Sequence, residues 1–105
     1  TQTFVSLGAK PFIMLLSPPT ETELPNLDEA RAFLFDGNAG FMLNIGTWHE
    51  FPFVLLDDTD VLTILRSEAT NGLEVDNVIG NEAVSPDLEK RDMGARFGVN
   101  IAIEL

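Results

Sequence analysis

The chain has 105 residues, which suits one folded domain, and 45% of them are hydrophobic, which argues against disorder. It contains no cysteine, so disulfides and zinc–thiolate sites are excluded. Seventeen acidic residues against six basic ones give a formal net charge of −11, so nucleic acid, which binds to clustered lysines and arginines, is not an expected partner. The longest apolar run, Phe12 to Leu16, is too short to cross a bilayer and no charged leader precedes it, so we expect no membrane contact and a cytoplasmic location.

The first part of the chain predicts short strands separated by turns. Residues 3–7 alternate polar and apolar side chains, as a half-buried strand does, and residues 11–17 are typical of a strand buried on both faces. Residues 18–29 contain three prolines and predict a loop, with a single helical turn at residues 28–30. Alternation returns over residues 31–37, where a glycine–asparagine pair predicts a turn.

The second part continues this pattern and then loses it. Strands are predicted over residues 40–46 and 51–58, on either side of an adjacent tryptophan and histidine, and over residues 60–66. Residues 67–94 show no clear period and predict a long irregular or partly helical excursion. Residues 97–105 alternate again, as a final strand would.

Six or seven short strands with frequent turns predict an all-β barrel or sandwich, because no segment has a sustained helical period. We expect four phenylalanines in its core: Phe33, Phe35, Phe51 and Phe53. The acidic stretch Asp57 to Asp60 is predicted to be a solvated turn, since it lacks the ligand spacing and the glycine of a calcium loop.

His49 is the only histidine and lies beside the only tryptophan, Trp48. A histidine side chain exchanges a proton near neutral pH and therefore serves as a general acid or base. Gly46 would let the backbone turn into such a site, Trp48 would shield one side of a pocket, and Glu50 would orient the imidazole or act as a carboxylate itself. The alternatives are an ordinary hydrogen-bonded histidine at a strand edge and a solvated glutamate.

Arg31 and Arg66 each lie at the end of an apolar segment. A guanidinium binds a carboxylate through two hydrogen bonds, so either residue would hold a small anionic substrate against the negative field of the protein. The alternative is a salt bridge to one of the many acidic residues.

Several stretches, in order and with compatible spacing, resemble the ureidoglycolate lyases, also called ureidoglycolate hydrolases, of the cupin superfamily. They are "TQTFVSLGAKPFIMLL", "RAF", "GFMLNIGTWHEFPF" and "DVLTILR", and they extend from Thr1 to about Arg66. The resemblance implies one cupin-like β-barrel domain of the jelly-roll type over residues 1–105, with the long excursion before a final strand. It also implies that N-terminal strands of the barrel precede Thr1.

The resemblance extends to two cupin motifs. "GTWH", which ends at His49, is similar to the second motif, and Gln2 and Gly8 are similar to the tail of the first, whose other ligands would precede Thr1. Asn44 occupies a position where members of the family commonly have histidine. We therefore assign no metal ligand and no cofactor; a divalent metal is expected only where upstream ligands complete the site.

The resemblance implies a lyase of allantoin and purine catabolism that releases urea and glyoxylate from ureidoglycolate. It implies catalytic roles for His49 and Glu50, and substrate-binding roles for Gln2, Arg31, Asn44, Trp48 and Arg66. The alternatives are another small hydroxy- or keto-acid as substrate, or a degenerate, non-catalytic cupin that binds a small carboxylate or acts as a dimerising structural domain. A homodimer is the expected assembly.

Overall fold

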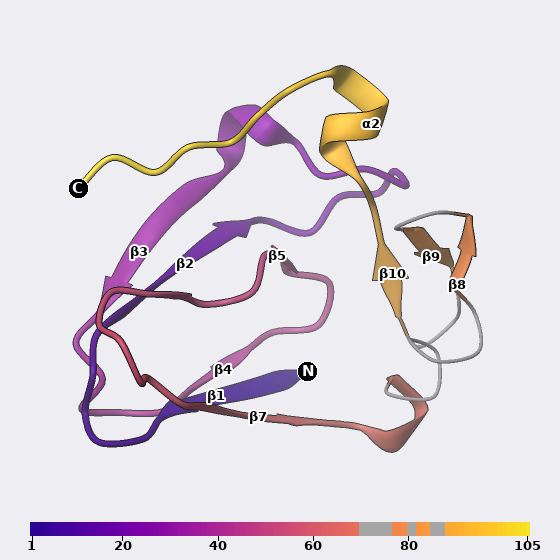
Figure 1. Ribbon diagram of the computed structural model, residues 1–105. Coiled ribbons are helices and arrows are strands. Elements are labelled where there is room, and N and C mark those ends of the chain that lie inside the picture. The colour runs from indigo at the N-terminus through magenta and orange to yellow at the C-terminus, as the bar shows by residue number, and fades with distance from the viewer. Residues whose placement is uncertain (70–76, 80–81, 85–87) are drawn as a thin grey trace. The chain divides into compact units, whose positions relative to one another are not determined.

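The computed structural model describes residues 1–69, 77–79, 82–84 and 88–105. They form two compact units, residues 1–65 and residues 66–105, which are described separately (Figure 1). A single domain over the whole chain stays a prediction. Across the described residues, no helix has the length and apolar character needed to span a membrane.

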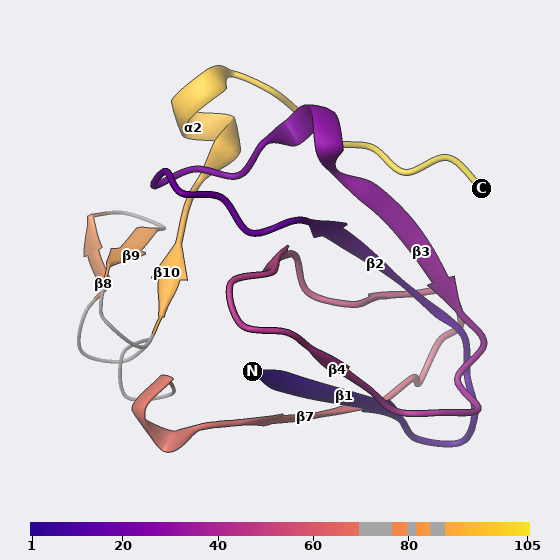
Figure 2. The same ribbon diagram turned by 180° about the vertical axis from the view of Figure 1, so that it is seen from behind.

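The first unit contains two antiparallel sheets. In one sheet, β1 (Gln2–Ser6) lies between β4 (Phe41–Leu43) and β7 (Val61–Leu65). In the other, β2 (Phe12–Ser17) lies beside β3 (Arg31–Phe35), as Figure 2 shows. The short strands β5 (Trp48–His49) and β6 (Phe53–Val54) pair with the other side of β2. The chain therefore passes from one sheet to the other four times, between β1 and β2, β3 and β4, β4 and β5, and β6 and β7.

Phenylalanine rings from both sheets meet in the core of this unit. Phe4 of β1 stacks on Phe41 of β4 with ring centroids 5.3 Å apart, and Phe12 of β2 stacks on Phe35 of β3 at 5.2 Å. Phe41 joins the two pairs, because its centroid lies 4.2 Å from that of Phe35 and 5.9 Å from that of Phe12. Met14 packs into the same cluster and is fully buried. This aromatic cluster fixes one sheet against the other.

The loop after β2 carries the predicted helical turn. It is a 3-10 turn, η1 (Leu27–Glu29), and the Asn26 side chain caps it by accepting a hydrogen bond from the backbone N–H of Asp28 at 3.1 Å. Ser17, at the end of β2, donates to the Asn26 carbonyl at 3.0 Å and so ties the loop to the sheet.

The described part of the second unit includes three strands and the short helix α2. β8 (Asn77–Ile79), β9 (Glu82–Val84) and β10 (Glu89–Lys90) form an antiparallel sheet, and α2 (Met93–Phe97) follows. The Asp92 side chain caps α2 by accepting from the Ala95 N–H at 3.0 Å, and Gly98 ends it in the left-handed conformation. The Arg91 side chain is buried and donates to the Ala83 carbonyl at 3.0 Å.

The prediction of a predominantly β-sheet, cupin-like fold is confirmed, but several segments differ from their predictions. The strand predicted over residues 51–58 is only β6 (Phe53–Val54), and Trp48–His49, predicted to lie between strands, forms β5. Residues 98–105 form no strand, and Phe97 belongs to α2. Alternation alone does not make a strand without a neighbour to hydrogen-bond, and Ile101 accordingly remains 47% exposed. The excursion over residues 67–94 contains β8, β9 and β10 instead of being only irregular or helical; its residues 70–76, 80–81 and 85–87 lie outside the described part.

The expected phenylalanine core is right for Phe35 only. Phe33, Phe51 and Phe53 are 47%, 71% and 43% exposed. Phe33 lies on an edge strand, Phe51 lies in the non-strand link between β5 and β6, and Phe53 pairs with Ile13 on the sheet face away from Phe12. The most deeply buried rings of the core, Phe4 and Phe12, lie in the two strands that were predicted to be half-buried and buried on both faces.

The acidic stretch after β6 is a turn, as predicted. The Thr59 hydroxyl donates to the Leu56 carbonyl at 2.7 Å, and the Lys10 ammonium donates to the backbone carbonyls of Asp57 and Asp58. Nowhere in the described ranges do three or more histidine, aspartate or glutamate side chains gather as a metal site would require.

Acid is expected to destabilise the second unit, because it protonates the Glu82 carboxylate. The Arg96 guanidinium, whose Nε donates to the Glu82 carboxylate at 2.7 Å, and the backbone N–H of Asp92 lower the pKa of Glu82 from 4.5 to about 2. Folding depresses the pKa of Glu82, so the ionised carboxylate stabilises the folded unit fully above about pH 4.5. This stabilisation is lost as the pH falls toward 2. The amide hydrogens of α2 should therefore exchange faster with solvent across this interval.

The matched variant is Glu82→Gln, which keeps the shape of the side chain and removes its titration. We expect it to flatten the acid dependence of α2 exchange between pH 5 and 2, leaving the smaller contribution of Glu68, whose pKa is also lowered. An unchanged acid dependence in Glu82→Gln would show that another group is responsible.

Candidate functional site

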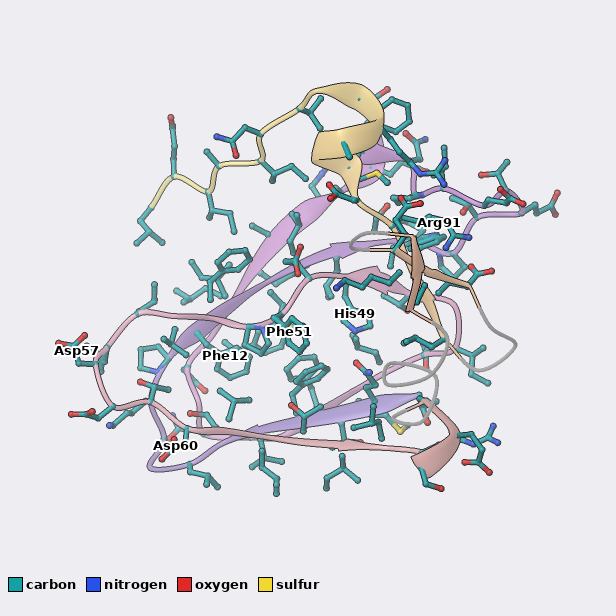
Figure 3. The ribbon with its side chains drawn as sticks, turned by 45° about the vertical axis from the view of Figure 1, so that its right-hand side comes forward. Phe12, His49, Phe51, Asp57, Asp60 and Arg91 are labelled. Carbon is teal, nitrogen blue, oxygen red and sulfur yellow. The ribbon has the colours of Figure 1, made fainter. Side chains whose placement is uncertain are left out.

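The His49 imidazole connects the two sheets of the first unit. His49 extends from β5, and its Nε2 lies 2.6 Å from the side-chain Oε1 of Gln2 on β1 (Figure 3). Its Nδ1 lies 3.0 Å from the backbone carbonyl oxygen of Thr47. The ring also meets Phe4 edge-on, with centroids 6.0 Å apart and planes at 75°. Both nitrogens therefore have polar partners, and the aromatic cluster supports the ring from one side.

A tight turn carries the chain from β4 into β5 and sets this geometry. The Thr47 N–H donates to the Asn44 carbonyl at 3.3 Å, and Gly46 has a φ of +83°. A positive φ at the third of four residues is the mark of a type II turn, and it explains why glycine occupies this position. Asn44 directly follows Leu43, which is paired with Gln2, so the turn begins next to the Gln2–His49 contact.

Trp48 faces away from His49, because successive residues of a strand point to opposite faces of the sheet. Trp48 is paired with Ser17, and its indole Nε1 donates to the Thr20 hydroxyl at 2.9 Å. That hydroxyl donates in turn to the Leu24 carbonyl at 2.8 Å. Trp48 thus anchors the proline-rich loop to β5, and the geometry does not bring it to the imidazole as a pocket wall.

Glu50 does not orient the imidazole either. Its carboxylate accepts a hydrogen bond from the Phe51 backbone N–H at 3.0 Å, and its own N–H donates to the Leu15 carbonyl at 3.2 Å. The ring is held instead by Gln2 and by the Thr47 carbonyl. The sequence motif had pointed to Gln2 as a substrate-binding residue, whereas a backbone carbonyl such as that of Thr47 has no sequence signal.

Arg31 lies in register with His49. Both residues are paired with Leu16, from opposite sides of β2, so they occupy the same sheet face two strands apart, with Cα atoms about 10 Å from each other. The Arg31 Nη1 donates to the carbonyls of Asp28 and Ala30 at 2.9 and 2.8 Å, and its side chain is exposed.

Arg66 belongs to the second unit. Its Nη2 lies 3.4 Å from Glu68 Oε1, and both side chains are more than half exposed. This is the salt bridge that was weighed as the alternative to a substrate contact. Among the predicted residues, the structure therefore brings the side chains of His49 and Gln2 into contact, whereas Asn44 begins the adjoining turn and Arg31 shares only the sheet face.

The described residues do not fit the divalent metal of a typical cupin. The site offers one imidazole, whose two nitrogens already have hydrogen-bond partners, and neutral amide groups from Gln2 and Asn44. Such metals are held by several imidazole, carboxylate or thiolate ligands, and no cluster of three such residues occurs within the described ranges.

Replacing Gly46 is expected to disturb the site more than replacing a comparable glycine elsewhere. Gly46→Ala combines the strain of a positive φ, about 1–3 kcal/mol, with a Cβ placed 3.2 Å from the Cβ of Pro19. Gly8→Ala has the same φ strain, at +78°, but its nearest atom is 4.0 Å away. Urea unfolding followed by Trp48 fluorescence should therefore show the larger loss of stability for Gly46→Ala.

The two variants should also differ in the NMR signal of the His49 imidazole. Gly46→Ala is expected to shift it, since the turn leads directly into β5, and Gly8→Ala is not. Equal losses of stability and an undisturbed imidazole signal would contradict the role given to this turn.

Comparison with known proteins identifies relatives for most of the chain. Residues 1–87 match the family described as ureidoglycolate lyase. The ureidoglycolate lyase of Azotobacter vinelandii is 38% identical over 69 residues, which are 66% of this chain and 40% of that protein. The ureidoglycolate lyase of Pseudomonas aeruginosa is 30% identical over 74 residues, 70% of this chain and 43% of that protein. No solved structure matches significantly. The chain thus spans less than half the length of these curated relatives, and it belongs to the ureidoglycolate lyase family.

Proposed function

We propose that this chain contributes a ureidoglycolate lyase activity, in which His49 moves the proton. The observation that carries the proposal is the anchored imidazole, held at both nitrogens between two sheets, in a chain of this family. A general base needs a defined direction toward its substrate, and a ring fixed at two points has one.

The reaction requires one proton to leave an oxygen and one to reach a nitrogen. Ureidoglycolate carries a hydroxyl and a ureido nitrogen on the same carbon. Removal of the hydroxyl proton allows the C=O bond of glyoxylate to form while the C–N bond breaks, and the departing nitrogen takes up a proton to give urea. A single imidazole serves both steps when it takes the first proton and returns it to the nitrogen.

Other residues of the site suit the remaining groups of this substrate. Arg31 shares the sheet face of His49 and would hold the carboxylate, after exchanging its present bonds to the carbonyls of Asp28 and Ala30. Gln2 and Asn44 would bind the ureido group, since amide side chains both donate and accept hydrogen bonds. Glu50 and Arg66 remain predicted contributors without a contact to the imidazole.

The second candidate function is a non-catalytic cupin that binds a small carboxylate. Asn44 favours this alternative, because an amide does not exchange protons near neutral pH as a second histidine would. Both candidates require ligand binding next to His49, and only the lyase requires turnover.

Turnover is expected to depend on His49. His49→Ala should reduce the release of glyoxylate from ureidoglycolate by about 10²–10⁴-fold, the usual contribution of general acid–base catalysis. Glu21→Gln changes an exposed side chain of the proline-rich loop and serves as the control with unchanged turnover. Glyoxylate release is followed by a coupled assay, and addition of glyoxylate to the wild-type chain is followed on the His49 NMR signal.

The outcomes separate the candidates. Turnover that survives in His49→Ala removes the proton-transfer role. A His49 signal that shifts with glyoxylate in a chain without turnover favours the carboxylate-binding alternative. A signal that no ligand disturbs contradicts both.

We also propose that the chain forms a homodimer through the outer face of the β4–β1–β7 sheet. Met42, Leu62 and Ile64 are 60%, 48% and 55% exposed on that face, and the register places Met42 and Ile64 on either side of Thr3. Three exposed apolar side chains on one sheet face favour a partner surface.

Ile64→Lys is expected to shift the chain from dimer to monomer in analytical ultracentrifugation, because a buried unpaired ammonium opposes association. Leu34→Lys, at a 67% exposed position on the other sheet, is the matched control and should leave the dimer intact. A monomeric wild-type chain, or equal effects of the two variants, would contradict this interface.

A further inference from the structure

We infer that Nε2 is the nitrogen of His49 that gives and takes the proton, and that the Gln2 amide is the positioning group that follows this change by turning over. The catalytic meaning of this inference rests on the proposed function. The assignment of the two nitrogens rests only on their hydrogen-bond partners.

The partners of the two nitrogens differ in one decisive respect. Nδ1 lies 3.0 Å from the Thr47 carbonyl oxygen, which only accepts hydrogen bonds. Thr47 ends the turn that begins at Asn44, and its backbone carbonyl carries no hydrogen that it could donate to Nδ1. Nε2 lies 2.6 Å from the Gln2 side chain, which carries an accepting oxygen and a donating NH₂ on the same carbon.

The observed orientation satisfies the charged ring completely. With Gln2 Oε1 toward Nε2 and the Thr47 carbonyl toward Nδ1, both ring nitrogens face acceptors. Only an imidazolium, which has a hydrogen on each nitrogen, donates to both at once. The Phe4 ring packs against the imidazole at 75°, and the neighbouring Glu50 carboxylate accepts a hydrogen bond from the Phe51 N–H.

The neutral ring must lose one of these hydrogens, and the partners determine which. Loss from Nδ1 would leave its lone pair against the lone pairs of a carbonyl that cannot turn. Loss from Nε2 is accommodated by a half-turn of the Gln2 amide, which then donates to Nε2 from its NH₂ group. Neutral His49 is therefore the Nδ1–H tautomer, with the Nε2 lone pair held by Gln2.

This arrangement gives the proposed reaction a direction. The substrate hydroxyl takes the place of the Gln2 NH₂ on Nε2 and passes its proton there. The amide oxygen then accepts from the imidazolium until Nε2 returns this proton to the departing ureido nitrogen, which restores the neutral ring. The neutral amide pairs with Nε2 in either state by turning over, whereas a glutamate carboxylate only accepts hydrogen bonds and would hold the proton on Nε2. A substrate-binding role alone would not require Gln2 to respond to the state of the ring.

The first test measures the wild-type chain alone. Long-range proton–nitrogen NMR correlations of the single histidine distinguish the two tautomers of the neutral ring directly, with the protein labelled with nitrogen-15 and kept at a pH where the imidazole is uncharged. We expect the hydrogen on Nδ1. A neutral ring with its hydrogen on Nε2 would overturn the inference, whether or not the chain has lyase activity.

Two variants test the amide itself. Gln2→Leu should leave the hydrogen on Nδ1, because Thr47 still accepts it, while the Nε2 signal moves toward that of a nitrogen without a partner. Gln2→Glu should enlarge the protonated fraction of His49 at neutral pH. Thr3→Val, next on β1 but on the outer face of the sheet, should change neither signal.

These outcomes are independent of turnover. If Gln2→Leu moves the hydrogen to Nε2, or if Gln2→Glu leaves the protonated fraction unchanged, Gln2 has no positioning role. Loss of activity in His49→Ala together with an Nε2–H ring in the wild type would retain the proposed function and reject this inference. Backbone amide spectra of each variant confirm that the fold is kept.

Discussion

The aromatic cluster between the sheets is the interaction on which the site depends. Gln2 and His49 belong to different sheets, so their 2.6 Å contact exists only while the two sheets keep their separation and register. Phe4, Phe12, Phe35 and Phe41 set that separation by stacking at 4.2–5.9 Å across the interior. Phe4 extends the cluster to the imidazole itself, two residues along β1 from Gln2. One strand therefore carries both a core ring and a polar partner of the site.

Along β1 and β5, neighbouring residues point to opposite faces of the sheet and therefore make different contacts. On β1, Gln2 and Phe4 face inward, while Thr3 faces outward among exposed apolar side chains. On β5, His49 faces the site and Trp48 faces the proline-rich loop, where Thr20 holds its indole. A side chain adjacent in sequence is thus on the opposite face in space. The tryptophan contributes by fixing the loop and strand that carry the histidine.

The sequence was informative where the period was short and the turn chemistry was specific. The strands around residues 3–7 and 31–37 follow from alternation, and the strand around residues 11–17 follows from a continuous apolar run. Gly46 marked a turn, and the structure has a positive φ there. The candidate site was predictable as far as His49 and Gln2, because both lie in segments that resemble the two cupin motifs. Thr47 was missed since its contribution is a backbone oxygen. The final strand failed because an alternating segment needs a neighbouring strand, and pairing between distant segments has no local signal.

The distribution of charge in the first unit bears on how an anionic ligand would be held. Residues 1–65 contain nine acidic residues and only two basic ones, Lys10 and Arg31. Both donate to backbone carbonyls, and neither forms an ion pair among the described residues. A carbonyl is a weaker partner for a cation than a carboxylate is, so a ligand carboxylate would displace it at modest cost. Lys10 lies at the acidic turn after β6, whereas Arg31 shares a sheet face with His49. In a unit this acidic, Arg31 is the basic residue that shares a sheet face with the imidazole, and the carboxylate-binding role proposed for it rests on that placement.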